Sequence, residues 1–258
     1  MSEDEIDDSR APLLDHLIEL RSRLIKSFIG LGLCFAICLY FARPIFAFLV
    51  HPLLRAGQGK LVYTQLFEAF FVEVKVAFFA GAMLAFPIIA NQIWLFVAPG
   101  LYKKEKRALL PFICATPVLF LMGAALAYFV AIPMALHFLL GFQGDLGGVK
   151  QEALPSMGNY LSFVMQFMFG FGIAFLMPVL LMLMERAGVV TRQQLVSFRR
   201  YAIVANTAIA ALLAPPDIGS MILLAVPLVL LYELALIGIW FTERKRARES
   251  AALPAVVE

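Results

Sequence analysis

Long uninterrupted apolar stretches limit what this chain can fold into. The stretch 108–140 is far longer than the roughly 20 residues that a helix needs to cross the hydrocarbon core of a bilayer. Hydrophobic residues make up 62% of the 258 residues, and charged residues only 15%. No water-soluble core of this size could bury so much apolar surface. The sequence therefore predicts an all-α, polytopic membrane protein.

Six apolar segments predict six transmembrane helices, at about 27–41, 76–97, 108–140, 160–184, 201–214 and 220–241. Ahead of the first, leucine and isoleucine recur at helical spacing over 11–25 and indicate an amphipathic helix at the membrane interface. Residues 1–10 are acidic, and we expect them to be a disordered tail. The predicted domains are this tail, a single six-helix membrane domain over 11–243, and a basic tail over 244–258.

The fifth segment is unusually short. It has fourteen residues, 201–214, before Pro215, Pro216 and Asp217 end the helix. At a rise of 1.5 Å per residue this helix is about 21 Å long, against about 30 Å of hydrocarbon. We therefore expect its outer end to lie below the outer membrane surface, where the lipid must thin or water must enter.

Basic residues predict the orientation. Of the 21 Lys and Arg residues, sixteen fall on the side of both termini and of two short loops. Lys and Arg concentrate on the cytoplasmic side of membrane proteins, so both termini are predicted to be cytoplasmic. Because these charges form short clusters at the ends of the spans, they predict no nucleic-acid surface. The five on the other side are Arg43, Arg55, Lys60, Lys75 and Lys150.

Few polar residues lie within the predicted spans. These residues leave a transporter as an alternative function. A proton-coupled small-molecule transporter would need several of them to converge near the middle of the membrane. A protease is not indicated, because His16, His51 and His137 belong to no catalytic motif. The Cys residues lack metal spacing and are interpreted as packing residues. The polar candidates for a transporter are Asn91, Gln92, Gln166, Asn206 and Glu233.

Four segments together resemble the TatC family, the receptor subunit of the twin-arginine protein translocase. They are HLIELRSRLI at 16–25, QIWLFVAPGLYKKEKR at 92–107, YLSFVMQFMFGFG at 160–172 and LLAPPDIGSMILLAVPL at 212–228. The resemblance implies a six-helix bacterial inner-membrane protein with both ends cytoplasmic and two short last helices. It also implies a receptor for twin-arginine signal peptides that exports folded proteins on the proton-motive force.

The resemblance further implies partners and sites. The partners are small TatA and TatB subunits, signal peptides of folded cargo and further copies of the chain, with no cofactor and no enzyme activity. Signal-peptide binding is assigned to Glu19, Glu105, Lys103 and Arg21. Transport or partner contact is assigned to Asp217, Pro52, Phe96, Gln166 and Glu233.

Two glutamates suit the recognition of paired arginines. A guanidinium is planar and always charged, so a preorganised carboxylate can accept paired hydrogen bonds from it and discriminate against lysine. We expect Glu19 and Glu105 to do this at the cytoplasmic face. The alternative is that Glu19 pairs with Arg23 at i,i+4, and Glu105 with its flanking lysines, as solvated charges worth a few tenths of a kcal/mol.

Four further positions qualify these assignments. The family often carries a glutamate in the fourth helix, where this chain has Leu176, so a mechanism that needs a charge there is in doubt. Gln166 is the polar residue of this segment; we do not assume that it inherits that role, because a neutral amide can at most hydrogen-bond a partner helix. Asp217 has a second interpretation as the N-cap of the last helix. Glu233 has one as a residue that snorkels to the interface.

Overall fold

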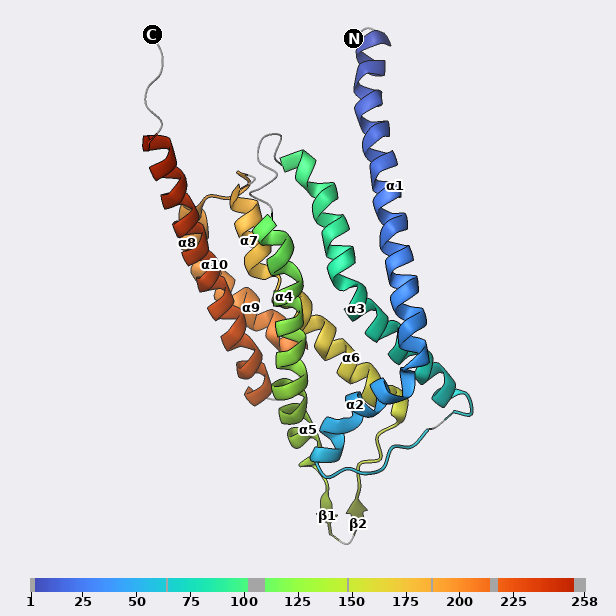
Figure 1. Cartoon of the computed structure of the whole chain (residues 1–258). Coiled ribbons are helices and arrows are strands. Elements are labelled where there is room, and N and C mark those ends of the chain that lie inside the picture. The colour runs from blue at the N-terminus through green and yellow to red at the C-terminus, as the bar shows by residue number, and fades with distance from the viewer. Residues whose placement is uncertain are drawn as a thin grey trace, which may run out of the picture. The chain divides into compact units, whose positions relative to one another are not determined.

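The computed structural model describes residues 3–63, 65–101, 110–147, 149–186, 188–213 and 218–252. Helices dominate these ranges, as predicted, and one short antiparallel hairpin is present (Figure 1). The elements in chain order are α1 (Glu3–Tyr40), α2 (Ala42–Arg55), α3 (Glu68–Leu101), α4 (Leu110–Leu126), η2 (Ala127–Ala131), α5 (Ile132–Leu140), β1 (Gly144–Leu146), β2 (Val149–Gln151), α6 (Met157–Ala174), α7 (Met177–Arg186), α8 (Arg192–Ser197), α9 (Arg199–Leu213) and α10 (Ile218–Ala252).

Five stretches of the described residues are long and apolar enough to cross a membrane. Each overlaps one of the predicted spans, so the multi-pass helical architecture is confirmed. The one predicted span left over is the fifth, 201–214, which corresponds to α9, a helix of 15 residues with an axial length of about 22 Å. Because α9 is too short to count among these stretches, six crossings stay a prediction. The five stretches are Leu17–Tyr40, Glu68–Phe96, Phe112–Leu140, Met157–Arg186 and Leu224–Arg244.

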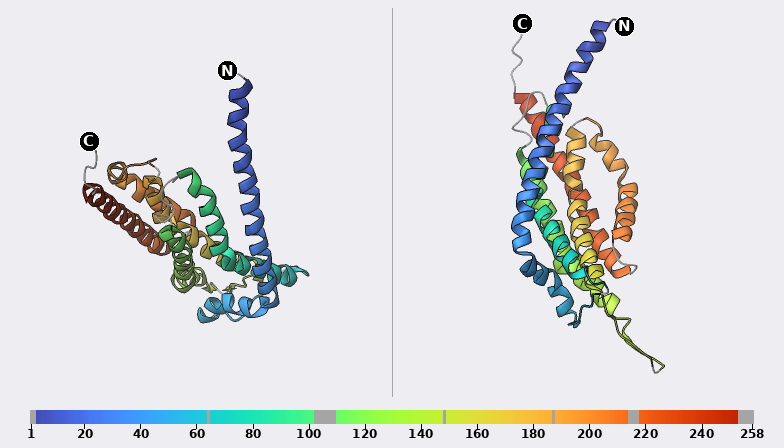
Figure 2. Two further views of the ribbon diagram at one scale, coloured as in Figure 1. Left: turned by 45° about the horizontal axis from the view of Figure 1, so that its top comes forward. Right: turned by 90° about the vertical axis from the view of Figure 1, so that its right-hand side faces the viewer.

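Three boundaries differ from those predicted. The expected interfacial helix, the first span and most of the acidic segment 1–10 form one unbroken helix, α1, as Figure 2 shows in both views. Acidic residues at a helix N-terminus favour this continuation because they oppose the positive end of the helix dipole. At the other end, α10 has 35 residues. It is not short, because no Gly or Pro interrupts the basic segment after its apolar span.

The third difference is a break in the fourth predicted span. The helix ends at Ala174 and resumes at Met177. Proline at 178 has no backbone N–H to donate to the preceding turn, which explains why the regular helix stops here. The turn stays closed through a bond from the Leu176 N–H to the Ile173 carbonyl at 2.9 Å.

The chain divides into two compact units, each described by itself. The first comprises residues 1–51, 60–117 and 154–162. In it, α1 packs closely on α3 at glycine positions, because a Cβ on Gly81 would meet the Phe35 Cα at 2.8 Å. Buried side chains also bond across elements, with Trp94 Nε1 donating to Thr116 Oγ1 at 2.8 Å. The first unit therefore holds α1 against α3, and the Trp94–Thr116 bond joins α3 to α4.

The loops of the first unit are tied together at the other end of α3. The Glu68 carboxylate accepts a hydrogen bond from the Gly158 N–H at 2.7 Å, which satisfies a free donor in the first turn of α6. Val62 forms a bridge with Ser156 beside it. The buried Tyr160 hydroxyl donates to the Leu49 carbonyl at 3.0 Å and adds α2 to this assembly.

The second unit comprises residues 52–59, 118–153 and 163–258. Here α4 crosses α6 at two glycines. A Cβ on Gly123 would lie 2.5 Å from the Phe171 carbonyl oxygen, and one on Gly172 would lie 2.6 Å from the Phe120 ring. At Gly123 the neighbouring atom is backbone, so the two helices approach too closely for a side chain there; at Gly172 a Cβ would require the Phe120 ring to move.

The remaining helices of the second unit pack around α10. A buried cluster formed by Leu195, Tyr232, Leu236 and Ile239 joins α8 to α10. The Tyr232 hydroxyl donates to the Leu195 carbonyl at 2.7 Å. Thr191 begins α8 with a capping box, in which its side chain accepts from the Gln194 N–H and the Gln194 side chain accepts from the Thr191 N–H. This cap fixes where α8 begins and so places Leu195 against α10.

Candidate functional site

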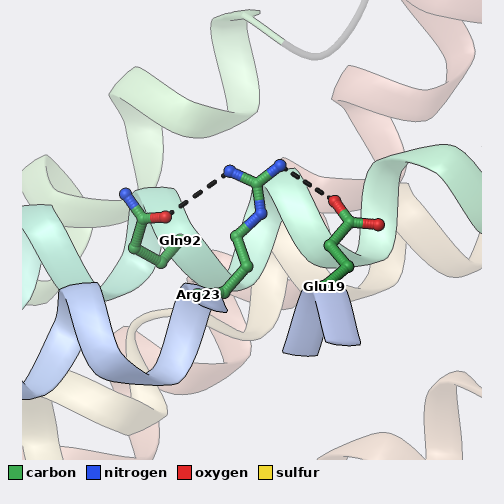
Figure 3. A network of polar contacts seen from close by, with 3 residues as sticks. All are labelled: Glu19, Arg23 and Gln92. Atoms are coloured by element: carbon green, nitrogen blue, oxygen red, sulfur yellow. Dashed lines mark hydrogen bonds and ion pairs between the residues drawn. The ribbon is translucent and has the colours of Figure 1, made fainter. Parts of the chain in front are cut away.

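One polar network lies between α1 and α3 of the first unit (Figure 3). The Arg23 Nη2 donates to the Glu19 Oε1 at 2.9 Å. The Nη1 of the same guanidinium donates to the Gln92 Oε1 at 3.5 Å, a long hydrogen bond. Residues 19 and 23 are one turn apart on α1, so the two side chains lie on one face and reach each other directly. Arg23 therefore bridges a carboxylate on its own helix and an amide on the neighbouring one.

The Glu19 carboxylate is only partly used. Its side chain is 34% exposed, and that of Arg23 is 24% exposed. Within the ranges that the structure describes, the second oxygen, Oε2, accepts no hydrogen bond. The ion pair that our alternative interpretation predicted is therefore present, yet Glu19 keeps a free oxygen and access to solvent.

Of the other residues assigned to signal-peptide binding, Arg21 is the one that the structure describes, and it does not join this network. Arg21 is exposed and lies about 200° around α1 from both Glu19 and Arg23, because i,i+2 residues do not share a helix face. It makes no hydrogen bond or ion pair to any described residue. Lys103 and Glu105 lie outside the described residues, and their assigned roles stay predictions.

The residues assigned to transport or partner contact are placed as follows. Pro52 is buried within α2, and Phe96 is half-buried in α3. Gln166 is exposed on α6, and Leu176 is half-buried at the break before α7. Asp217 lies outside the described residues. No role of these residues is tested by their positions.

Glu233 has a partner that the sequence analysis missed. The Arg199 Nη2 donates to the Glu233 Oε2 at 2.8 Å, joining α9 to α10 in the second unit. The two residues are 34 positions apart, so no local pattern connects them. The available signal was that both lie near predicted cytoplasmic ends of neighbouring helices. Glu233 is therefore a neutralised charge rather than an isolated acid in an apolar helix.

We expect Arg199→Leu to destabilise the protein by about 1 kcal/mol, because Glu233 then loses its cation in an apolar helix. This corresponds to a fall of about 2–4 °C in the midpoint of thermal unfolding in detergent. The double variant Arg199→Glu with Glu233→Arg should recover most of the loss. Arg43→Leu is the matched control, because the side chain of Arg43 is 87% exposed in its pair with Glu73. Equal losses from Arg199→Leu and Arg43→Leu would contradict this assignment.

The transporter candidates make few contacts with one another. Gln92 is bonded to Arg23, and Glu233 to Arg199. Asn206 is buried in α9, and its Nδ2 has no hydrogen-bond partner among the described residues. Across those same ranges, no three His, Cys, Asp or Glu side chains lie close enough to hold a metal ion. The network of Glu19, Arg23 and Gln92 is the polar cluster best suited to exchange a bond with a cationic ligand.

Together, these features define a multi-pass, α-helical membrane protein with a partly exposed carboxylate and guanidinium between its first two long helices. The model of the family described as Sec-independent protein translocase protein (TatC) matches residues 15–227. The chain therefore belongs to the TatC family and is a component of the Sec-independent protein translocase. Proteins of this family are components of a translocase rather than enzymes. Membership of the family therefore favours a role in protein translocation over the alternative of a small-molecule transporter.

Individual relatives agree with this assignment. A TatC protein of Magnetococcus marinus is 47% identical over 95% of this chain and 90% of its own length. One of Aquifex aeolicus is 41% identical over 93% of this chain and its entire length. A crystal structure of the twin-arginine translocase receptor TatC in DDM is 40% identical, with a TM-score of 0.73, and covers 86% of this chain and 98% of that chain. The predicted family is confirmed.

Proposed function

We propose that this protein is the signal-peptide receptor of a twin-arginine export system. Glu19 and Glu105 bind the two guanidinium groups of the signal. The observation that supports this most directly is the Glu19 carboxylate, which already accepts a guanidinium hydrogen bond at 2.9 Å and is 34% exposed. A carboxylate so placed has the geometry to receive an arginine from outside the chain. Lys103 and Arg21 are each two residues from one of these glutamates in the sequence and are further proposed contacts of the signal peptide, Arg21 from a different face of α1 than Glu19.

We further propose the setting in which this receptor acts. The chain lies in the bacterial cytoplasmic membrane with both termini in the cytoplasm, as the distribution of Lys and Arg favours. It works with single-span TatA and TatB subunits and with further copies of itself to move folded cargo, driven by the proton-motive force. Asp217, Pro52, Phe96, Gln166 and Glu233 are the proposed positions for transport or partner contact.

Photocrosslinking tests the receptor proposal. A photoreactive residue at Ser22, exposed and one turn from Glu19, should crosslink a synthetic twin-arginine signal peptide. The same residue at Tyr40, which is 85% exposed at the far end of α1, is the control. A peptide with both arginines replaced by lysine should crosslink at Ser22 much more weakly. Equal crosslinking of the two peptides, or stronger crosslinking at Tyr40 than at Ser22, would rule out this site.

A further inference from the structure

We infer that Arg23 is an internal competitor for the arginine of the signal peptide. In the ligand-free receptor its guanidinium occupies one oxygen of the Glu19 carboxylate, and it must leave that oxygen before a signal arginine can bind both oxygens. This inference rests on the proposed function and assigns to Arg23 a part in setting the affinity of that site. It is a positioning role, because Arg23 acts through Glu19.

The geometry allows such an exchange. Only one oxygen of Glu19 and one nitrogen of Arg23 form the ion pair, at 2.9 Å, so the bond is not the two-pronged kind that holds a guanidinium most firmly. Both side chains are partly exposed, so an incoming guanidinium reaches the carboxylate without unfolding α1. The ion pair between Arg23 and Glu19 therefore blocks the carboxylate only weakly, and an incoming arginine can break it.

Gln92 gives the displaced guanidinium a second partner. The Gln92 Oε1 accepts from the Arg23 Nη1, on the opposite side of the guanidinium from the bond to Glu19 (Figure 3). When Glu19 turns to an external arginine, the Arg23 Nη1 keeps its bond to α3. The positive charge of Arg23 is then anchored beside the site rather than left without a hydrogen-bond partner.

Competition of this kind has a quantitative signature. If a ligand binds only receptors in which Glu19 is free, its apparent affinity falls by the fraction of receptors in that state. An exposed i,i+4 pair of this kind keeps Glu19 occupied in more than half of the receptors, which weakens binding by roughly threefold. Every ligand that uses Glu19 is weakened by the same factor. Arg23 therefore lowers affinity without changing the preference for arginine over lysine.

Binding measurements on the full-length protein in detergent test this inference. The probes are a fluorescent twin-arginine signal peptide and its two-lysine counterpart. We expect Arg23→Gln to tighten binding of both peptides roughly threefold and to leave the ratio of their affinities unchanged. Arg23→Lys should give an intermediate result, because an ammonium lacks the planar fork of a guanidinium. The charge-matched control is Lys26→Gln, since Lys26 is exposed on α1 and has no bond to Glu19; it should change neither affinity.

A double-mutant cycle separates this inference from the proposed function. In the Glu19→Gln background, Arg23→Gln should have no effect, because the pair no longer exists. If Glu19→Gln weakens binding but Arg23→Gln weakens it too, Glu19 is a receptor residue and the competitor role is wrong. If Glu19→Gln leaves binding unchanged, the proposed function of Glu19 itself fails. Should Arg23→Gln not fold, wild-type affinity in Arg23→Lys would overturn the inference alone.

Discussion

Gly123→Ala is expected to destabilise the protein strongly, because α4 and α6 touch at this residue. The added Cβ would lie 2.5 Å from the Phe171 carbonyl oxygen and 2.9 Å from the Phe175 Cβ. The first of these atoms belongs to the backbone of α6 and cannot rotate away, so the helices must move apart. Overpacking of this kind typically costs about 1–3 kcal/mol, and a larger side chain such as valine should prevent accumulation of the protein.

Gly32→Ala is the matched control for this variant. Gly32 also lies within a long helix, α1, and an added Cβ has no neighbour within 4 Å. Alanine in an open helical position is better than glycine by roughly 0.5–1 kcal/mol, so the two variants should shift stability in opposite directions. Thermal unfolding in detergent and the amount of protein in the membrane measure both. A Gly123→Ala protein as stable as wild type would contradict the close crossing.

Glu19→Ala and Glu105→Ala are each expected to reduce the affinity for a twin-arginine signal peptide at least about tenfold. A hydrogen bond to a charged group contributes about 1.5–3 kcal/mol, which corresponds to about 10- to 150-fold in affinity. The double variant should fall to the level of the two-lysine peptide. Stability should change little in Glu19→Ala, because a partly exposed i,i+4 pair is worth only about 0.3–0.5 kcal/mol.

Glu73→Ala controls for the loss of one negative charge. The Glu73 carboxylate is 44% exposed, also belongs to the first unit and pairs with Arg43 at 3.4 Å. Affinity measured by fluorescence anisotropy and export of a folded reporter should both be unaffected by it. Wild-type affinity in Glu19→Ala and Glu105→Ala would end the receptor proposal, whereas binding without export would place the defect in a later step.

The helical, multi-pass fold was predictable because membrane spans leave a long and simple signal. A run of twenty apolar residues is recognisable in any sequence, and the short segment 201–214 was evident from its two prolines. The boundaries were less predictable. Nothing in composition shows that α1 continues through the interface into the membrane, since a helix breaks only where a residue or a contact breaks it.

Only those contacts of the site that join residues close in sequence were predictable. The pairing of Glu19 with Arg23 follows from their spacing of four residues, and the structure contains it. Gln92, by contrast, comes from α3, 69 positions beyond Arg23, and its bond depends on how α1 and α3 pack. Arg199 and Glu233 are likewise distant in sequence. Such partners cannot be read from a single sequence, because spacing carries no information about separate helices.

The π-helical segment η2 has a consequence for how α4 and α5 present their side chains. Buried residues recur at every fourth position through it, at Phe120, Ala124, Tyr128, Ile132 and Leu136, with the buried Ala127, Ala131 and Ala135 directly before the last three. Four residues overshoot one α-helical turn by about 40°, so a regular helix would carry this stripe progressively away from its neighbours. The wider turn, closed by the Ile132 N–H on the Ala127 carbonyl, takes back part of that rotation. The segment thus keeps the buried side chains of α5 in line with those of α4. If the same residues formed a regular α-helical turn instead, α5 would be rotated about its own axis.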